Sequence, residues 1–262
     1  MDKVAINQPQ QPLTAEEIER VKTRINGIER SWGKMWTDKL KDQIEQQSLW
    51  SGGQQLHFSF NDWNPNRQPD SQLGADIGNQ AYMLAKKMEQ EPINVNLFGN
   101  RGTGKTSLAL AMIDKVSKDS DKSWLFINTV ELANLISRSY QYPESREQLN
   151  ELYKAITGIR SGDGSWYRKP VDVLVLDDFG TEGGQNSDEL RVRRDMQDWL
   201  YRASNARIDL QNNQPTGSTI ITTNNTSNEL LRMYDPKLIS RIVTKNPQHV
   251  IDFTKAKDVR NG

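Results

Sequence analysis

The sequence predicts a three-layer α/β fold in which a five-stranded parallel sheet lies between helices. From about residue 76 onward, short apolar runs typical of buried strands alternate with longer segments of helical periodicity. A glycine-rich loop also stands directly between one such run and one such helical segment. Parallel strands connected by helices account for both observations.

The expected elements follow in chain order. Strands are expected at Asn94–Phe98, Trp124–Asn128, Val171–Asp177, Ser218–Thr223 and Val250–Phe253. Helices are expected at Asp76–Met88, Thr106–Val116, from Val130 onward and around Glu189–Arg207, with an irregular stretch before the third strand. Apolar residues at the centre of each strand, such as Val173–Leu176 and Ile220-Ile221, are typical of a sheet that is covered on both faces.

Composition excludes several classes of protein. The 262 residues carry no net charge, contain no cysteine, and include only two histidines, His57 and His249. Disulfides are therefore impossible and a zinc site is not expected. No run approaches the ~18 apolar residues of a membrane span, so we expect a cytoplasmic protein with no membrane partner.

The first 50 residues are predicted to form a small helical domain. Thr14 and Glu17 have capping-box spacing, and an apolar stripe follows at helical spacing. Its members are Ile18, Val21, Ile25, Ile28, Trp32, Met35, Leu40 and Ile44. The stripe either packs on the body of the protein or docks on a partner. Residues 51–75, which carry the aromatic side chains of Phe58, Phe60 and Trp63, are expected to be a linker before a core at 76–262.

The glycine-rich loop has the composition of a complete phosphate-binding loop. Its glycines let backbone N–H groups turn toward phosphate oxygens, and the next helix begins at the loop. In such a loop Lys105 bridges the β- and γ-phosphates of ATP, and the Thr106 hydroxyl binds Mg²⁺. The predicted ATP-binding residues are Gly99, Asn100, Arg101, Gly102, Thr103, Gly104, Lys105, Thr106 and Ser107.

A second motif is the strand that ends in Asp177 and Asp178. Ligands bind at the carboxyl ends of strands in open α/β sheets. We therefore expect Asp177 to hold the Mg²⁺ shell and Asp178 to polarise the attacking water.

Two further residues are candidates for catalysis. Asn224 follows the strand Ser218–Thr223 and either senses the γ-phosphate or serves as a helix cap or turn residue. Arg241 is a single basic residue in a short apolar helix, where it forms either a surface ion pair or an arginine finger for a neighbouring subunit.

These motifs, in this order and spacing, resemble the AAA+ ATPases of the DnaC/DnaI-type replicative helicase loaders, with IstB-type transposition regulators as close relatives. The similarity covers roughly residues 56–253, from the Phe58–Trp63 segment to Thr222-Thr223-Asn224 and Ser240-Arg241-Ile242. Only 21 residues follow Arg241, so the C-terminal helical lid of full AAA+ proteins is expected to be absent. Asp178 stands where many relatives have Glu, which implies slow, partner-stimulated hydrolysis.

The resemblance implies single-stranded DNA contact through residues 138–169. This segment interleaves aromatic residues with six Lys and Arg residues against four Asp and Glu residues. The candidates are Tyr142, Arg146 and Lys154, although an amphipathic helix has a similar composition.

The implied function is loading of a DnaB-family hexameric helicase onto DNA, with the N-terminal helices gripping the helicase and the core assembling with further copies on helicase or DNA. Two alternatives stay open. One is an IstB-like, ATP-dependent transposition regulator. The other is a non-catalytic adaptor or antagonist of the helicase, in which bound nucleotide acts as a conformational switch.

Overall fold

The structure is a computed structural model that describes residues 19, 20, 22, 24, 34, 35, 37–182 and 192–260. It divides the chain into two compact units, Met1–Asp42 and Gln43–Gly262. The division therefore falls eight residues before the boundary expected after residue 50.

The first unit is helical wherever it is described. Met35, a member of the predicted apolar stripe, is exposed there. The predicted helix start at Thr14 and the stripe positions Ile18, Val21, Ile25, Ile28 and Trp32 lie outside the described residues. Ile44, the last member of the stripe, belongs to the second unit and is buried in its core, whereas the role of the members in the first unit stays a prediction.

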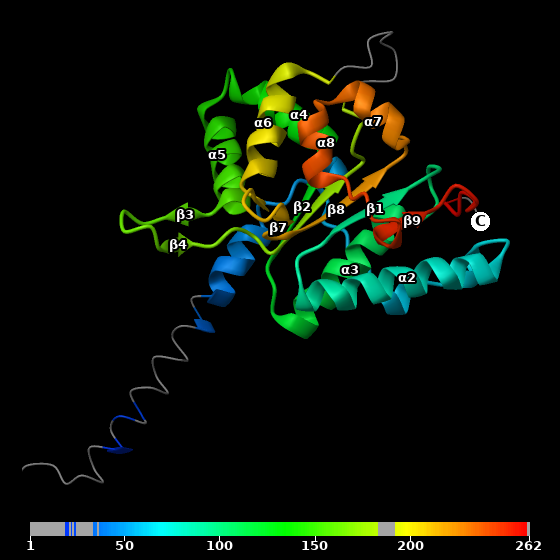
Figure 1. Ribbon diagram of the computed structural model, residues 1–262, viewed down its shortest axis with the longest axis horizontal. Coiled ribbons are helices and arrows are strands. Elements are labelled where there is room, and N and C mark those ends of the chain that lie inside the picture. Colours follow the sequence, from blue (N-terminus) through cyan, green and yellow to red (C-terminus); the bar gives the residue numbers. More distant parts are fainter. Residues whose placement is uncertain are drawn as a thin grey trace, which may run out of the picture. The chain divides into compact units, whose positions relative to one another are not determined.

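The second unit is built on a five-stranded parallel sheet, which confirms the predicted fold class (Figure 1). The strands are β1 (Asn94–Phe98), β2 (Trp124–Asn128), β5 (Val173–Asp177), β8 (Ser218–Thr223) and β9 (Val250–Asp252). Their order across the sheet is β2-β5-β8-β1-β9. All five carboxyl ends consequently lie along one edge, which is where the polar strand endings of the sequence meet.

Helices cover both faces of the sheet (Figure 1). One face packs against α2 (Ser71–Gln90) and α3 (Lys105–Ser120). The other face packs against α4 (Thr129–Ser139), α5 (Pro143–Thr157), α6 (Arg194–Asn205), α7 (Ser227–Met233) and α8 (Pro236–Ile242). The three predicted layers are therefore present.

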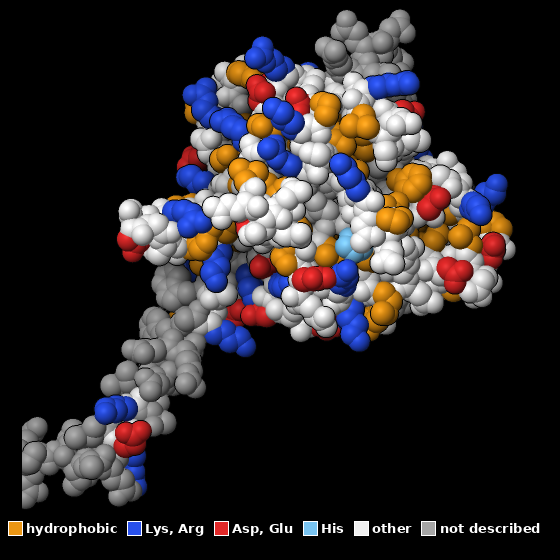
Figure 2. All heavy atoms as spheres, in the orientation of Figure 1, with side chains coloured by type: hydrophobic (Ala, Val, Ile, Leu, Met, Phe, Trp, Pro, Cys, Tyr) orange, Lys and Arg blue, Asp and Glu red, His pale blue; other side chains and the backbone are white. Residues whose placement is uncertain are grey.

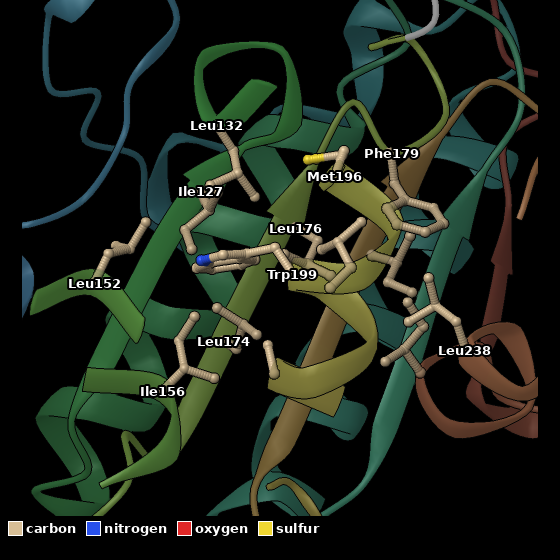
Figure 3. Packing of buried hydrophobic residues seen from close by; sticks show 14 of the residues in the cluster. Ile127, Leu132, Leu152, Ile156, Leu174, Leu176, Phe179, Met196, Trp199 and Leu238 are labelled. Carbon is tan, nitrogen blue, oxygen red and sulfur yellow. The ribbon is translucent and has the colours of Figure 1, made fainter. Parts of the chain in front are cut away.

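Alternating side chains of each strand supply the two cores. In β5, Val173 and Val175 belong to the cluster under α2 and α3, whereas Leu174 and Leu176 belong to the opposite cluster. Figure 3 shows Trp199 of α6 lying over Leu174 and Leu176 in that second cluster. Burial on both faces explains why β5 has apolar residues at four consecutive positions, Val173–Leu176.

Residues 51–75 were predicted to be a linker, but Phe58, Phe60 and Trp63 pack against the core, and so do the residues just before this segment. Leu49 pairs with the outer edge of β2 through Leu49 N to Phe126 O (2.9 Å) and Asn128 N to Leu49 O (2.8 Å). Trp50 stacks on Phe126 with ring centroids 4.4 Å apart. These residues are apolar or aromatic and complete the core at the sheet edge.

The helix α2 begins at Ser71, five residues before the expected start. The side chain of Asp70 accepts a hydrogen bond from Leu73 N at 3.1 Å and so caps the helix. The Asn and Pro residues before it, which suggested a linker, form two short 3-10 turns, Phe60–Asp62 and Pro65–Arg67.

The stretch expected to be irregular holds regular structure. It contains α5 and the hairpin of β3 (Ile159–Arg160) and β4 (Trp166–Arg168). Polar residues dominate α5, and only Leu152, Ala155 and Ile156 are buried, so its helical period is weak. A second small hairpin, β6 (Ile208–Asp209) and β7 (Gln214–Pro215), follows α6.

After β9, residues 253–260 contain no helix. Within the described part of the chain, no helix is both long enough and apolar enough to cross a membrane.

Candidate nucleotide site

The candidate site is a cavity of about 510 Å³ at the carboxyl edge of the sheet, where the loop between β1 and α3 faces the ends of β5 and β8. It is lined by Arg67, Arg101, Gly102, Thr103, Gly104, Lys105, Thr106, Ser107, Asp178, Thr181, Asn224, Val259 and Arg260. Most of the predicted ATP-binding residues therefore meet in one cavity. Gly99 and Asn100 contact it through Lys105, as described below.

Trp63 supports the loop from beneath. Its ring lies where a Cβ atom on Gly104 would come within 2.8 Å and one on Gly78 within 2.6 Å. Gly104 also has a φ of +100°, a conformation that favours glycine. The indole N–H donates to Gly74 O at 2.9 Å, so Trp63 joins the loop to α2.

Lys105 is buried and folded back onto its own loop. Its Nζ donates to Gly99 O (2.8 Å), Asn100 O (2.6 Å) and Asn224 Oδ1 (2.8 Å). Burial lowers the pKa of Lys105 to about 8, against the attraction of the carboxylates of Asp178 and Asp177. All three acceptors are uncharged, so a phosphate anion is a stronger partner for this ammonium group.

Thr106 and Asp177 meet as predicted for a Mg²⁺ site. Thr106 Oγ1 lies 2.8 Å from Asp177 Oδ1, and Thr222 Oγ1 donates to the same oxygen at 2.7 Å. Burial raises the pKa of the Asp177 carboxyl, against the hydrogen bond from Thr222. No cluster of three or more His, Cys, Asp or Glu side chains suited to a metal occurs among the described residues. One carboxylate and one hydroxyl nevertheless fit Mg²⁺, which takes its other ligands from phosphates and water.

Asp178 has an unusual backbone conformation, with a φ of +55°. Its N–H donates to Thr222 Oγ1 at 2.9 Å, and the following residue, Phe179, donates to Thr222 O at 2.9 Å. The left-handed conformation is tolerated by Asp better than by most residues. The strand β8 therefore fixes the turn that places the Asp178 carboxylate in the cavity.

Asn128 is a site residue that the sequence reasoning missed. Its Nδ2 lies 3.4 Å from both Asp177 Oδ2 and Asp178 Oδ2, while its Oδ1 caps α4. The available signal was a polar residue at the end of β2, in the same place that Asp177 has in β5. Asn224, by contrast, was singled out, and its contact with Lys105 places it in the site.

Arg241 does not line the cavity of its own chain. Its guanidinium lies over the ring of Tyr201, 4.7 Å from the centroid, and its buried Nη1 has no hydrogen-bond partner among the described residues. Its backbone O accepts from Asn94 Nδ2 at 2.7 Å, at the amino end of β1. The contacts of Arg241 are thus with Tyr201 and Asn94, neither of which lines the cavity.

The three DNA candidates do not converge. Tyr142 is exposed at the N-cap of α5, Arg146 Nε donates to Ser139 O at 3.3 Å, and Lys154 pairs with Glu151 at 2.6 Å. Tyr142 and Lys154 are separated by almost the whole 15-residue helix, or roughly 18 Å along its axis.

Arg67, Thr181, Val259 and Arg260 also line the cavity and were not predicted. Thr181 lies in the turn after β5, whereas the other three come from segments that flank the sheet, where no strand-end or loop pattern marked them in the sequence.

No curated protein sequence matches the chain. Among solved structures, the chain is similar to a putative primosome component from Streptococcus pyogenes serotype M3, with 17% identity over 69% of this chain and 78% of the other and a TM-score of 0.43. It is also similar to the DnaC helicase loader (18% identity, 74% and 97% coverage, TM-score 0.48) and to DnaI (17% identity, 74% and 87% coverage, TM-score 0.45). These likenesses are weak and carry no functional conclusion.

A family profile gives the firm assignment. The profile of the "ATPase family associated with various cellular activities (AAA)" matches residues 95–247, which include the phosphate-binding loop, the acidic strand end, Asn224 and Arg241. This match spans more than half of the chain and agrees with the contact of Lys105 with its own loop and with the contact between Thr106 and Asp177. The chain belongs to the AAA ATPase family, whose members bind ATP.

Proposed function

We propose that this chain is an ATP-dependent loader of a DnaB-family replicative helicase onto DNA. The contact between Thr106 and Asp177 carries the ATPase half of the proposal, because it brings the two predicted Mg²⁺ ligands together at the phosphate-binding loop. The helicase half is supported by the resemblance of the sequence motifs and by the aromatic segment, in which Trp63 packs beneath that loop.

In this proposal each polar side chain of the cavity has one task. Lys105 exchanges its carbonyl partners for the β- and γ-phosphates, and Thr106 and Asp177 hold Mg²⁺. When bound, Mg²⁺ neutralises phosphate charge. Asp178 orients and accepts a proton from the attacking water, and Asn224, already within reach of Lys105, detects the γ-phosphate.

Hydrolysis is expected to be slow until the protein assembles. Arg241 lies over Tyr201 and does not line the cavity of its own chain, so a contact between this arginine and the γ-phosphate requires a second copy. Self-association on helicase or DNA would supply it.

Single-stranded DNA is proposed to bind over α5. Figure 2 shows Lys and Arg side chains gathered over α5 and α6, with acidic side chains between them. Replacing Tyr142, Arg146 and Lys154 together with Ala should weaken salt-sensitive binding of a labelled oligonucleotide, because a stacking ring and two cations are lost. Lys118→Ala, which removes an exposed cation on α3 at the other face of the sheet, is the control. Unchanged affinity in the triple variant would remove this helix from the DNA site.

The decisive experiment is size-exclusion chromatography with light scattering. The host's replicative helicase is mixed with the full chain, and separately with residues 43–262, in ATP and in ADP. Truncation at residue 43 keeps Ile44, Leu49 and Trp50, which are part of the core, so loss of binding cannot be ascribed to loss of the fold. We expect a complex that needs residues 1–42.

The alternatives give different results. Failure to bind the helicase in either nucleotide would contradict the loader proposal and favour the IstB-like regulator, with a transposase as the next partner to test. Intact remodelling of the helicase by Lys105→Ala would instead favour the nucleotide-switched adaptor.

A further inference from the structure

Two segments from outside the sheet meet beside the phosphate-binding loop. Residues 254–260 follow β9, and Arg67 and Gln68 precede α2. The first segment is tied to the loop near both of its ends. Asn100 Nδ2 donates to Thr254 O at 2.9 Å, and Val259 N donates to Gly102 O at 3.0 Å.

The segment before α2 holds residues 254–260 in place. Gln68 is only 4% exposed, and its amide pairs with the backbone of Lys257 in both directions, at 2.8 Å and 3.1 Å. Arg67 Nη2 donates to Val259 O at 3.1 Å. A buried amide that satisfies both backbone groups of one residue fixes the path of this segment along the cavity.

The path brings a carboxylate against the loop. A Cβ atom on Gly102 would lie 2.1 Å from the carboxyl group of Asp258, and Gly102 has a φ of +72°. Glycine at this position therefore permits the close approach of Asp258 as well as the turn of the loop.

Asp258 in turn holds Arg260. The guanidinium of Arg260 contacts both carboxylate oxygens, at 2.9 Å and 3.2 Å, and Arg260 N donates to Asp258 Oδ1 at 2.9 Å. Both side chains are largely exposed, so the net stability of this ion pair is small.

Arg260 lies within the electrostatic range of the catalytic centre. Its charge contributes to lowering the pKa of Lys105, although burial of Lys105 is the larger cause. Its own pKa is raised, mainly by Asp258 and in part by Asp178. Together with its place in the wall of the cavity, this sets Arg260 on the phosphate side of the site.

We propose that residues 254–260 form one wall of the nucleotide site and that Arg260 exchanges its ion pair with Asp258 for the phosphate chain of the bound nucleotide. The inference rests on the proposed ATP binding and adds a residue to it. A planar guanidinium matches phosphate oxygens with two hydrogen bonds, and a triphosphate carries more charge than the single carboxylate that it replaces. Asp258 is then a competitor that holds Arg260 until nucleotide arrives.

The test compares two substitutions with opposite expected effects. Affinities for a fluorescent ATP analogue are measured by anisotropy with the full chain. Arg260→Ala should weaken binding about tenfold, because a charge-assisted contact is lost. Asp258→Asn should tighten binding two- to threefold, because Arg260 is released from its competitor. Arg232→Ala, an exposed arginine on α7, is the control and should change nothing.

Each outcome decides a separate question. Wild-type affinity in Arg260→Ala would overturn the inference. Weaker binding in Asp258→Asn, to the extent seen in Arg260→Ala, would show that the pair only holds the wall in place and would also overturn the exchange. Absence of ATP binding by the wild-type chain would contradict the proposed ATPase function itself.

Discussion

The two ends of the five-stranded sheet hold their polar side chains in different ways. At the amino end, Arg207 is fully buried and donates to Val171 O (2.8 Å), Asp172 O (3.2 Å) and Ser218 O (2.6 Å). The carboxylate of Asp172 accepts from both the N–H and the hydroxyl of Ser123. Every one of these partners belongs to the framework of the sheet.

At the carboxyl end the charged groups lie close together, but their contacts do not balance their charges. Lys105 has only uncharged acceptors, and Asp177 and Asp178 are neighbours whose negative charges repel each other. Burial lowers the pKa of Lys105 and raises the pKa of Asp177, so both charged forms are disfavoured. The difference indicates that the amino end serves stability, whereas the carboxyl end is completed by a ligand.

Lys105→Ala should give the largest effect at the carboxyl end. Loss of the ammonium group should weaken ATP binding on the order of 1,000-fold, because contacts to two phosphates disappear. The midpoint of thermal unfolding should stay nearly constant, since the lysine's partners are carbonyl and amide oxygens that water can satisfy. Lys118→Ala, at an exposed position of α3, is the control in calorimetric titrations. If the ATP affinity of Lys105→Ala stayed within a few-fold of wild type, the conclusion that the carboxyl end is completed by a ligand would be contradicted.

Arg241 is the exception at the amino end, because a buried nitrogen of its guanidinium has no partner among the described residues. Its substitution by Ala should slow hydrolysis by the assembled protein about 1,000-fold without changing ATP affinity, if it acts on a neighbouring subunit. Mixing Arg241→Ala with Asp178→Asn subunits should then restore part of the activity in a phosphate-release assay.

Failure of these mixtures to complement would show that Arg241 acts within its own subunit or has no part in hydrolysis. Arg193 and Arg194 would be the next candidates, together with Arg191, which lies outside the described residues.

Arg207→Met should reverse the pattern seen for Lys105. Three strand-end carbonyl groups lose their donor, which should lower the free energy of unfolding by about 3 kcal/mol. ATP affinity of the folded protein should not change. Urea unfolding with Arg194→Met as the exposed control measures the first quantity. A loss of ATP-binding free energy that exceeds the loss of unfolding free energy would show that the amino end also shapes the nucleotide site.

Substitution of His249, at the amino end, should give the smallest effect, and only on the pH dependence of protein stability. Burial lowers the pKa of His249 below its usual value of about 6.5, with a further contribution from Lys87, whose Nζ lies 3.2 Å from Nε2. The neutral form is therefore favoured in the folded state. Stability should fall as pH drops through 6.5 toward the lower pKa of the folded protein. His249→Asn should reduce this change in melting temperature between pH 7.5 and 5.5, and an unchanged difference would contradict the assignment.

The sequence predicted the parts of the molecule that depend on local pattern. Three of the five strands, Asn94–Phe98, Trp124–Asn128 and Ser218–Thr223, have their expected bounds, because apolar runs between polar residues mark a strand buried on both faces. The contacts of Lys105 and of Thr106 follow from the loop motif. The placement of Asn224 follows from parallel strands ending at one edge.

The sequence did not predict contacts between distant segments. Leu49 beside β2, Gln68 on Lys257, and Arg67 and Arg260 in the cavity wall depend on how flanking segments fold back on the sheet. Composition alone made residues 51–75 look like a linker, since Asn, Pro and Gly suit both linkers and tight capped turns. The packing of Trp63, and of Trp50 just before this segment, shows that it is a set of packed turns and not a linker.

The position of Trp63 has a mechanical consequence. Its ring fills the space beside both Gly78 in α2 and Gly104 in the loop, and its N–H is bonded to Gly74. A displacement of the loop against Trp63 would therefore press on a rigid ring, because no gap separates the two. The ring would transmit that motion to the 20-residue helix Ser71–Gln90. Movements of the loop and of this helix are thus coupled through the indole of Trp63.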